Sequence, residues 1–294
     1  MKENYINGLS EEGFHKVYYR DYGCENTANT LICVHGLTRN SCDFHFLAKA
    51  LKDKRRIVVP DVVGRGKSDR FSKPENYGYA QYLSDMNALL QRLNITDVDW
   101  LGTSMGGLFG IVLASLPNTP IRRLILNDIG PFVPASAIAR IKMYASSEVI
   151  FDSLEDANEI LRGTYAPFGP MSDDQWTYLF TNSIVKVDEG YTLAYDPNAT
   201  GAVEGNKADH EKSMVAEDEA GDVTFWDFWD RIKCPVLVIN GRESDILPPE
   251  VVKEMSTRGP SFDHVYIEKT GHAPSLMPDD QIEVVRQWLD KTSF

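Results

Sequence analysis

Short runs of hydrophobic residues alternate along the chain with longer segments in which hydrophobic residues recur at the spacing of one helix face. The short runs predict strands that are buried on both sides of a sheet, and the periodic segments predict helices. We expect strands at residues 16–22, 30–34, 56–59, 98–101, 122–126, 235–240 and 264–267. We expect helices at residues 42–51, 79–93, 105–115, 249–256 and 279–289. This alternation predicts an α/β fold with a mostly parallel sheet covered by helices on both faces.

The stretch from residue 131 to about residue 230 breaks this alternation. It is rich in aromatic residues and has amphipathic helical patterns at residues 135–144, 154–164 and 173–184, without a convincing buried strand. Residues 185–194 are compatible with a short hairpin, because Asp188-Glu189-Gly190 is typical of a turn. We interpret residues 131–230 as a helical cap inserted into a core formed by residues 1–130 and 231–294.

The composition excludes some classes of partner. The chain has 294 residues, of which 43% are hydrophobic and 25% charged, as in an ordinary soluble globular protein. A formal net charge of −13 argues against nucleic acid or an anionic membrane as the main partner. We see no secretory leader and no apolar stretch near the roughly 18 residues that span a bilayer. Cysteines at positions 24, 33, 42 and 234 show no metal-binding spacing, so we expect a cytoplasmic protein without a metal.

Candidate chemistry begins at Gly102-Thr103-Ser104-Met105-Gly106, which has the form G-x-S-x-G. An expected strand precedes this motif and an expected helix follows it. A serine at such a sharp strand-to-helix turn has its hydroxyl exposed above the sheet and needs neighbours that are nearly free of side chains. Ser104 is therefore the candidate nucleophile.

A serine nucleophile needs a base and an acid that orients the base. His272, in Gly271-His272-Ala273-Pro274, follows the last expected strand, and Asp245 lies in the loop after the preceding one. Both positions lie beyond the carboxyl ends of strands, where open α/β sheets place their sites. We expect Asp245 to orient His272, with Asp128, which follows the strand after Ser104, as the alternative acid.

His35-Gly36-Leu37 directly follows another expected strand. Gly36 allows the backbone to turn so that the Leu37 N–H and the Met105 N–H can both point at a developing oxyanion, and His35 would support this loop. Arg39, near the expected site entrance, either holds a substrate carboxylate or forms a structural ion pair, and the same alternatives apply to Arg65. Among the aromatic residues of the cap, Trp176 is a candidate wall of the substrate pocket.

These markers, together with Asp61-x-x-Gly64-x-Gly66-x-Ser68, resemble the α/β-hydrolase superfamily in content and order over nearly the whole chain outside the cap. The likeness is greatest to serine esterases, lipase-like enzymes and C–C-bond hydrolases with a helical cap. It implies a carboxylesterase that cleaves a small or medium apolar ester through an acyl-enzyme, without cofactor. The alternatives are a C–C-bond or lactone hydrolase with the same triad, and a ligand receptor with this fold. The sequence leaves the oligomeric state open.

Overall fold

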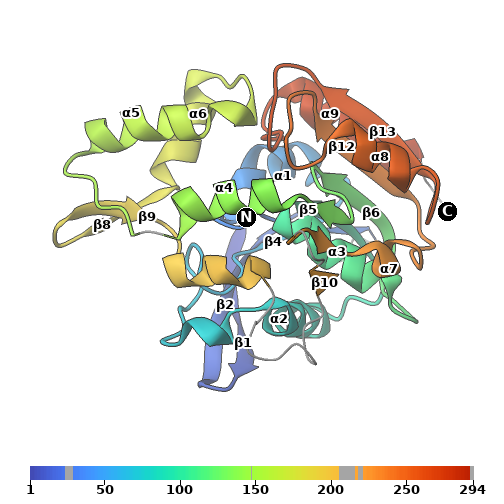
Figure 1. The fold of residues 1–294 in the computed structure, drawn as a ribbon. Helices are drawn as coiled ribbons and strands as arrows, with labels where there is room; N and C mark the ends of the chain where they lie inside the picture. Colours follow the sequence, from blue (N-terminus) through green and yellow to red (C-terminus); the bar gives the residue numbers. More distant parts are fainter. Residues whose placement is uncertain (24–28, 147, 205–215, 218–220, 292–294) are drawn as a thin grey trace.

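A central sheet organises the molecule (Figure 1). The computed structural model describes residues 1–23, 29–146, 148–204, 216–217 and 221–291. In spatial order the strands of the sheet are β1 (Lys2–Ser10), β2 (Gly13–Tyr22), β4 (Arg56–Pro60), β3 (Thr30–Val34), β5 (Val98–Thr103), β6 (Ile121–Asn127), β12 (Val236–Gly241) and β13 (Phe262–Ile267). The pairs β1–β2 and β2–β4 are antiparallel, and the pairs from β4 onward to β13 are parallel. The carboxyl ends of β3, β5, β6, β12 and β13 therefore meet at one edge.

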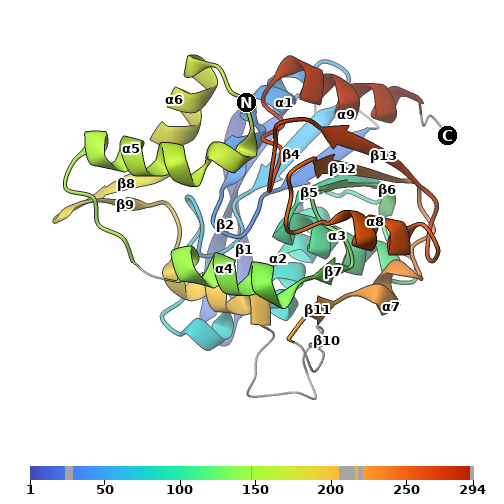
Figure 2. The same cartoon turned by 45° about the horizontal axis from the view of Figure 1, so that its top comes forward.

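Helices cover both faces of this sheet (Figure 2). On one face lie α1 (His45–Leu51) and α9 (Asp279–Lys291), and on the other lie α2 (Tyr79–Arg92), α3 (Met105–Ser115) and α8 (Pro249–Met255). Shorter elements are η1 (Ser41–Phe44), η2 (Pro74–Asn76) and α7 (Trp226–Trp229).

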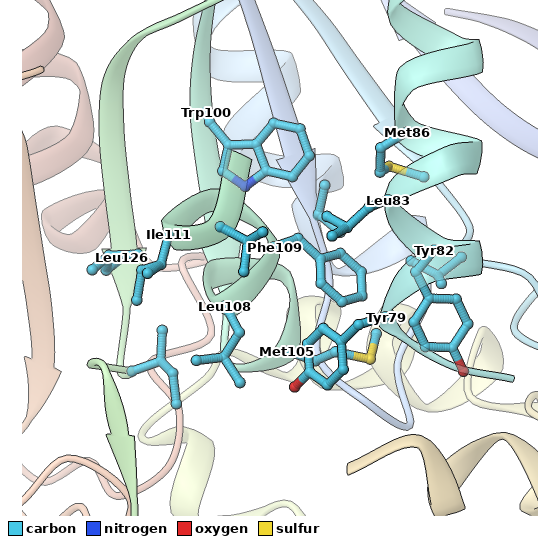
Figure 3. Packing of buried hydrophobic residues seen from close by; sticks show 14 of the residues in the cluster. Tyr79, Tyr82, Leu83, Met86, Trp100, Met105, Leu108, Phe109, Ile111 and Leu126 are labelled. Carbon is cyan, nitrogen blue, oxygen red and sulfur yellow. The ribbon is translucent and has the colours of Figure 1, made fainter. Parts of the chain in front are cut away.

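Both faces of the central strands are buried and mostly apolar, which explains the nearly continuous hydrophobic runs in the sequence. In β3, Leu31 and Cys33 pack under α1 and α9, whereas Ile32 and Val34 pack toward α2 and α3. Figure 3 shows the second of these cores, in which Phe109 of α3 lies between the sheet and α2. A strand buried on both sides cannot show polar alternation, because each face needs hydrophobic residues.

The segment between β6 and β12 contains α4 (Ala135–Ala145), α5 (Leu154–Thr164), η3 (Ala166–Phe168), α6 (Asp173–Thr181) and η4 (Pro197–Glu204). Strands β8 (Ile184–Val187) and β9 (Gly190–Leu193) form a hairpin. Near the ends of the segment, β7 (Phe132–Val133) pairs with β11 (Val223–Thr224), which also pairs with β10 (Ala216–Glu217). The chain thus leaves the core and returns to it through two neighbouring strands.

The predicted α/β fold with a mostly parallel sheet is confirmed. Strand β1 was not predicted, because it is an edge strand whose Tyr5 and Leu9 are exposed and whose polar residues hide the hydrophobic signal. The expected helix over residues 173–184 ends at Thr181, and the hairpin considered for residues 185–194 forms as β8–β9. Cys24 lies outside the described residues. None of the described helices has the length and hydropathy needed to cross a membrane.

Candidate active site

Ser104 lies at the sharp turn between β5 and α3. Its backbone has φ 51° and ψ −116°, a conformation that costs energy for a residue with a side chain. A Cβ atom on Gly102 would overlap the backbone of Gly106, and one on Gly106 would overlap the backbone of Val34. The turn can therefore form only because these two neighbours are glycines.

A hydrogen-bonded chain connects Ser104 to two groups at the same edge of the sheet. His272, in the loop after β13, has its Nε2 atom 2.9 Å from Ser104 Oγ. Its Nδ1 atom lies 2.7 Å from Oδ2 of Asp128, which directly follows β6. Because a carboxylate can only accept, Nδ1 carries the proton and Nε2 accepts from the serine hydroxyl.

Asp128 is completely buried and its carboxylate is surrounded by donors. Oδ1 accepts from Asn240 Nδ2 at 2.8 Å and from the Gly241 N–H at 2.7 Å. Oδ2 accepts from Ser244 Oγ at 2.6 Å in addition to His272. These hydrogen bonds hold the carboxylate in one orientation and satisfy both of its oxygens.

The expectation that Asp245 orients His272 is wrong, and the alternative, Asp128, takes this position. Asp245 is 54% exposed and binds Arg140 of α4 through contacts of 2.7 and 2.9 Å. In the same loop, the preceding residue Ser244 points inward and donates to Asp128. The loop after β12 therefore contributes the Ser244 hydroxyl to the site, whereas the Asp245 carboxylate in the same loop points away from His272.

The loop after β3 brings Gly36 and Leu37 beside Ser104, in the wall of the same cavity. His35 is fully buried, donates from Nδ1 to the Gly36 carbonyl at 2.7 Å, and accepts from the Val62 N–H at Nε2. Burial lowers the pKa of His35 to about 3, so the ring is neutral and acts as a bridge within the loop. Met105, the first residue of α3, has an N–H without an intrahelical acceptor.

Comparison with known proteins places this geometry in a family. The family model described as the α/β hydrolase fold matches residues 29–148. A 3-hydroxybutyrate-oligomer hydrolase of Cupriavidus necator is 38% identical over 290 residues, which cover 97% of this chain and 96% of that protein.

The chain belongs to the α/β-hydrolase family.

Solved structures agree with this assignment. A protein of Rickettsia typhi described as a hydrolase has a TM-score of 0.89 and 36% identity, and the match covers 100% of both chains. An α/β hydrolase of Novosphingobium aromaticivorans has a TM-score of 0.83 and 29% identity over 99% of this chain and 98% of that one. The protein is a hydrolase of this fold.

Arg65 of this α/β hydrolase lies behind the Leu37–Met105 region and is fully buried. It donates to the carbonyls of Leu37 at 2.8 Å and Ala199 at 3.0 Å, and its guanidinium also contacts Met105 Sδ at 3.8 Å. Within the described part of the chain, no carboxylate is paired with it. The sequence suggested a substrate carboxylate or an ion pair as the partner of Arg65. The spacing of residues could not reveal that Arg65 instead links the backbone of Leu37 to that of Ala199.

Arg39 forms an ion pair in the wall of the site. It binds both carboxylate oxygens of Asp43, at 2.7 and 3.0 Å, and donates to Ser183 Oγ at 2.8 Å. Its charge is therefore balanced inside the protein, although Arg39 is one of the residues that line the cavity beside Ser104. Trp176 is not brought to the site, because its ring packs within the segment between β6 and β12 and donates to Asn158.

Two cavities in the described structure meet at Ser104. The first cavity is lined by Gly36, Leu37, Thr38, Arg39, Asp43, Phe44, Thr103, Ser104, Ile141, Tyr144, Phe168, Leu179, His272, Ala273, Pro274, Ser275 and Met277. The second cavity is lined by Leu37, Tyr79, Tyr82, Ser104, Met105, Leu108, Ile129, Val133, Ile141 and Ile246. Among the described residues, no group of three or more metal-binding side chains is found.

Proposed function

We propose that the protein is a serine hydrolase that cleaves a carboxylic ester through an acyl-enzyme. The observation that carries this proposal is the chain of hydrogen bonds from Ser104 to His272 to Asp128, at 2.9 and 2.7 Å. It couples a weak nucleophile to a base, and the base to a buried carboxylate that fixes its tautomer.

In the first half of the reaction, Ser104 Oγ attacks the ester carbonyl while His272 Nε2 takes the serine proton. The carbonyl oxygen becomes an oxyanion, and the N–H groups of Leu37 and Met105 would stabilise it. Asp128 stabilises the positive imidazolium that forms. His272 then gives the proton to the leaving alcohol, the C–O bond breaks, and the acyl group remains on Ser104.

In the second half, water replaces the alcohol. His272 removes a proton from the water as its oxygen attacks the acyl carbonyl, and a second oxyanion forms in the same place. Collapse of this intermediate returns the proton to Ser104 Oγ and releases the carboxylic acid. The balance is one ester and one water converted to one acid and one alcohol, without a cofactor.

The substrate that we propose is a short ester of a hydroxy acid, such as a dimer or trimer of 3-hydroxybutyrate. The relative from Cupriavidus necator, at 38% identity over nearly both full lengths, is a 3-hydroxybutyrate-oligomer hydrolase. Both cavities beside Ser104 have mainly apolar walls with a few polar groups, which fits small molecules of mixed character.

We further propose that residues 131–230 act as a cap that selects the substrate. Ile141 and Tyr144 of α4, together with Leu179 of α6, line the first cavity beside Ser104. This segment thus supplies walls of the site, whereas the reacting groups come from the ends of β5, β6 and β13. Changes in the segment should alter the choice of substrate more than the chemistry.

A fluorophosphonate probe tests the nucleophile. The intact protein should gain the mass of one probe, and the Ser104→Ala variant should gain none. The matched control is Ser275→Ala, which removes another hydroxyl from the same cavity and should still be labelled. Equal labelling of the Ser104→Ala variant would refute a Ser104 nucleophile.

A substrate panel then tests the bond that is cleaved. We expect hydrolysis of the 3-hydroxybutyrate dimer and of p-nitrophenyl butyrate, and much slower reaction with a vinylogous diketone or a lactone. Faster cleavage of the diketone would replace the esterase proposal with C–C-bond hydrolysis. Tight binding of the dimer with turnover below about one per minute would favour a receptor, since typical enzymes turn over about ten times per second.

A further inference from the structure

The two cavities that Ser104 lines differ in their access to His272, the group that must protonate the leaving alcohol. His272 lines the first cavity, whereas the described residues that line the second cavity do not include it. Leu37 and Ser104 line both. When the carbonyl group of an ester lies at Ser104, the acyl part and the alcohol part of the ester, called here its acyl arm and its alcohol arm, can therefore extend into different cavities.

The chemistry of the proposed acyl transfer decides which arm lies where. His272 Nε2 must protonate the leaving alcohol oxygen, so this oxygen has to lie within hydrogen-bond reach of the imidazole. The alcohol arm then belongs in the first cavity, on the side of His272. The acyl arm, which receives no proton, belongs in the second cavity, beside Met105.

The second cavity is apolar except for a few hydroxyl groups. Leu108, Ile129, Val133 and Ile246 supply hydrophobic walls. The Tyr82 hydroxyl is already engaged, because it accepts from Arg65 at 2.8 Å and lies 3.3 Å from the Ala199 carbonyl. Among the side chains that line this cavity in the described structure, the polar group left besides Ser104 is the hydroxyl of Tyr79.

Tyr79 begins α2 and is only 7% exposed. Its ring packs against Phe109 and Phe225, with ring centroids 5.7 and 5.6 Å away. Figure 3 shows the ring beside Met105 and Leu108, residues that line the same cavity. Within the described part of the chain, the hydroxyl has no hydrogen-bond partner, and burial raises the pKa of the phenol above its ordinary value, so it stays protonated.

Because Tyr79 lines the cavity and its hydroxyl has no partner among the described residues, a molecule inside the cavity, water or a ligand, is left to satisfy it. We propose that the second cavity is the acyl site and that the Tyr79 hydroxyl selects acyl groups that carry a hydroxyl of their own. This inference rests on the proposed esterase function and adds to it the residue that recognises the acid part of the substrate. A plain acyl chain fills the same cavity but leaves the Tyr79 hydroxyl unsatisfied.

The test compares two pairs of esters with the Tyr79→Phe variant, which keeps the ring and its packing. The first pair, methyl 3-hydroxybutyrate and methyl butyrate, differs by a hydroxyl in the acyl arm, and each enantiomer is measured separately. The second pair, 3-hydroxybutyl butyrate and butyl butyrate, differs by a hydroxyl in the alcohol arm. We expect the kcat/KM ratio of the first pair to fall about tenfold, the effect of one lost hydrogen bond. The ratio of the second pair should change less than about twofold.

The matched control is Tyr77→Phe. The Tyr77 hydroxyl donates to Asp196 at 2.7 Å and accepts from the Phe71 N–H at 2.7 Å, and Tyr77 lines neither cavity. Its removal should leave both ratios unchanged. Thermal unfolding of both variants checks that the fold is retained.

The remaining outcomes overturn the inference in distinguishable ways. A fall in the second ratio would show that the two arms lie in the opposite cavities. Unchanged ratios for the Tyr79→Phe variant, with normal hydrolysis by the original protein, would remove the role of Tyr79 and leave the esterase proposal intact. If the original protein neither hydrolyses any of these esters nor reacts with a fluorophosphonate at Ser104, the esterase proposal fails and this inference fails with it.

Discussion

Replacing Asp128 by asparagine should abolish most of the activity, and the contacts of Asp128 explain how. Oδ1 is held by two N–H donors, from Asn240 and Gly241. Oδ2 faces His272 and the Ser244 hydroxyl, which can rotate to accept. An asparagine will therefore place its oxygen at the Oδ1 position and its NH₂ group toward His272.

That orientation reverses the hydrogen bond to the imidazole. Nδ1 must then accept, so the proton moves to Nε2, and the ring presents an N–H to Ser104 where the reaction needs a base. The same change in another serine hydrolase costs about 10⁴ in kcat. We expect a loss of 10³–10⁴ for Asp128→Asn, which corresponds to about 4–5 kcal/mol of transition-state stabilisation.

The matched control is Asp245→Asn. It makes the same chemical change in the aspartate that the sequence predicted to orient His272. Asp245 and its partner Arg140 are 54% and 45% exposed, and exposed ion pairs contribute about 0–1 kcal/mol. We expect kcat to change less than about tenfold. Steady-state hydrolysis of p-nitrophenyl butyrate measures both variants, and circular dichroism confirms folding. The reverse ranking of the two losses would refute the assignment of Asp128.

Three further predictions concern the rest of the site and the fold. Ser104→Ala and His272→Ala together should cost little more kcat than either alone, because the two residues act as a unit; additive losses in the double variant would contradict this. Arg65→Met should lower the free energy of unfolding by about 3 kcal/mol in a denaturant titration, because it leaves buried carbonyls without donors. A loss below about 1 kcal/mol would show that these hydrogen bonds contribute little to stability. Burial lowers the pKa of His15, but the hydrogen bond and charge of Asp85, with smaller contributions from the Gly13 backbone and Asp69, together outweigh burial and raise the pKa overall. The His15⁺–Asp85⁻ pair therefore stabilises the fold most below about pH 6.5. The unfolding free energy lost in His15→Gln should therefore be larger at pH 6 than at pH 9, and a pH-independent loss would contradict the charged pair.

The fold could be predicted because its strands are buried on both sides. Residues 31–34 and 57–59 are apolar or cysteine, every residue of β3 and β4 is buried, and a helix such as α2 buries one face. Helix α3 begins and ends at the expected residues because Ser104 and the glycines around it define its start. Strand β1 escaped prediction because an edge strand that pairs on one side needs few buried side chains.

The choice of acid shows what spacing alone cannot decide. Asp128 and Asp245 both follow strands at the correct edge of the sheet, so the sequence places each near His272. The structure separates them by the direction of their side chains. Asp128 has φ 56°, which turns the chain sharply at the end of β6, and its carboxylate lies inside a set of donors. Asn240 at the end of β12 was the available signal, because a buried amide there requires an acceptor nearby.

The pairing of β7 with β11 has a consequence for how this protein can change. Val133 lies opposite Val223, so the chain that leaves the core at one residue re-enters it beside that residue. The intervening stretch is a closed excursion, and for a flexible excursion each doubling of its length costs only about 0.6 kcal/mol of closure entropy. Changes of length at surface turns of this stretch, such as the turn between β8 and β9, should therefore be accepted more easily than changes at Ser183 or Ala199, which bind Arg39 and Arg65. New substrate ranges can evolve on this scaffold while the machinery beneath stays fixed.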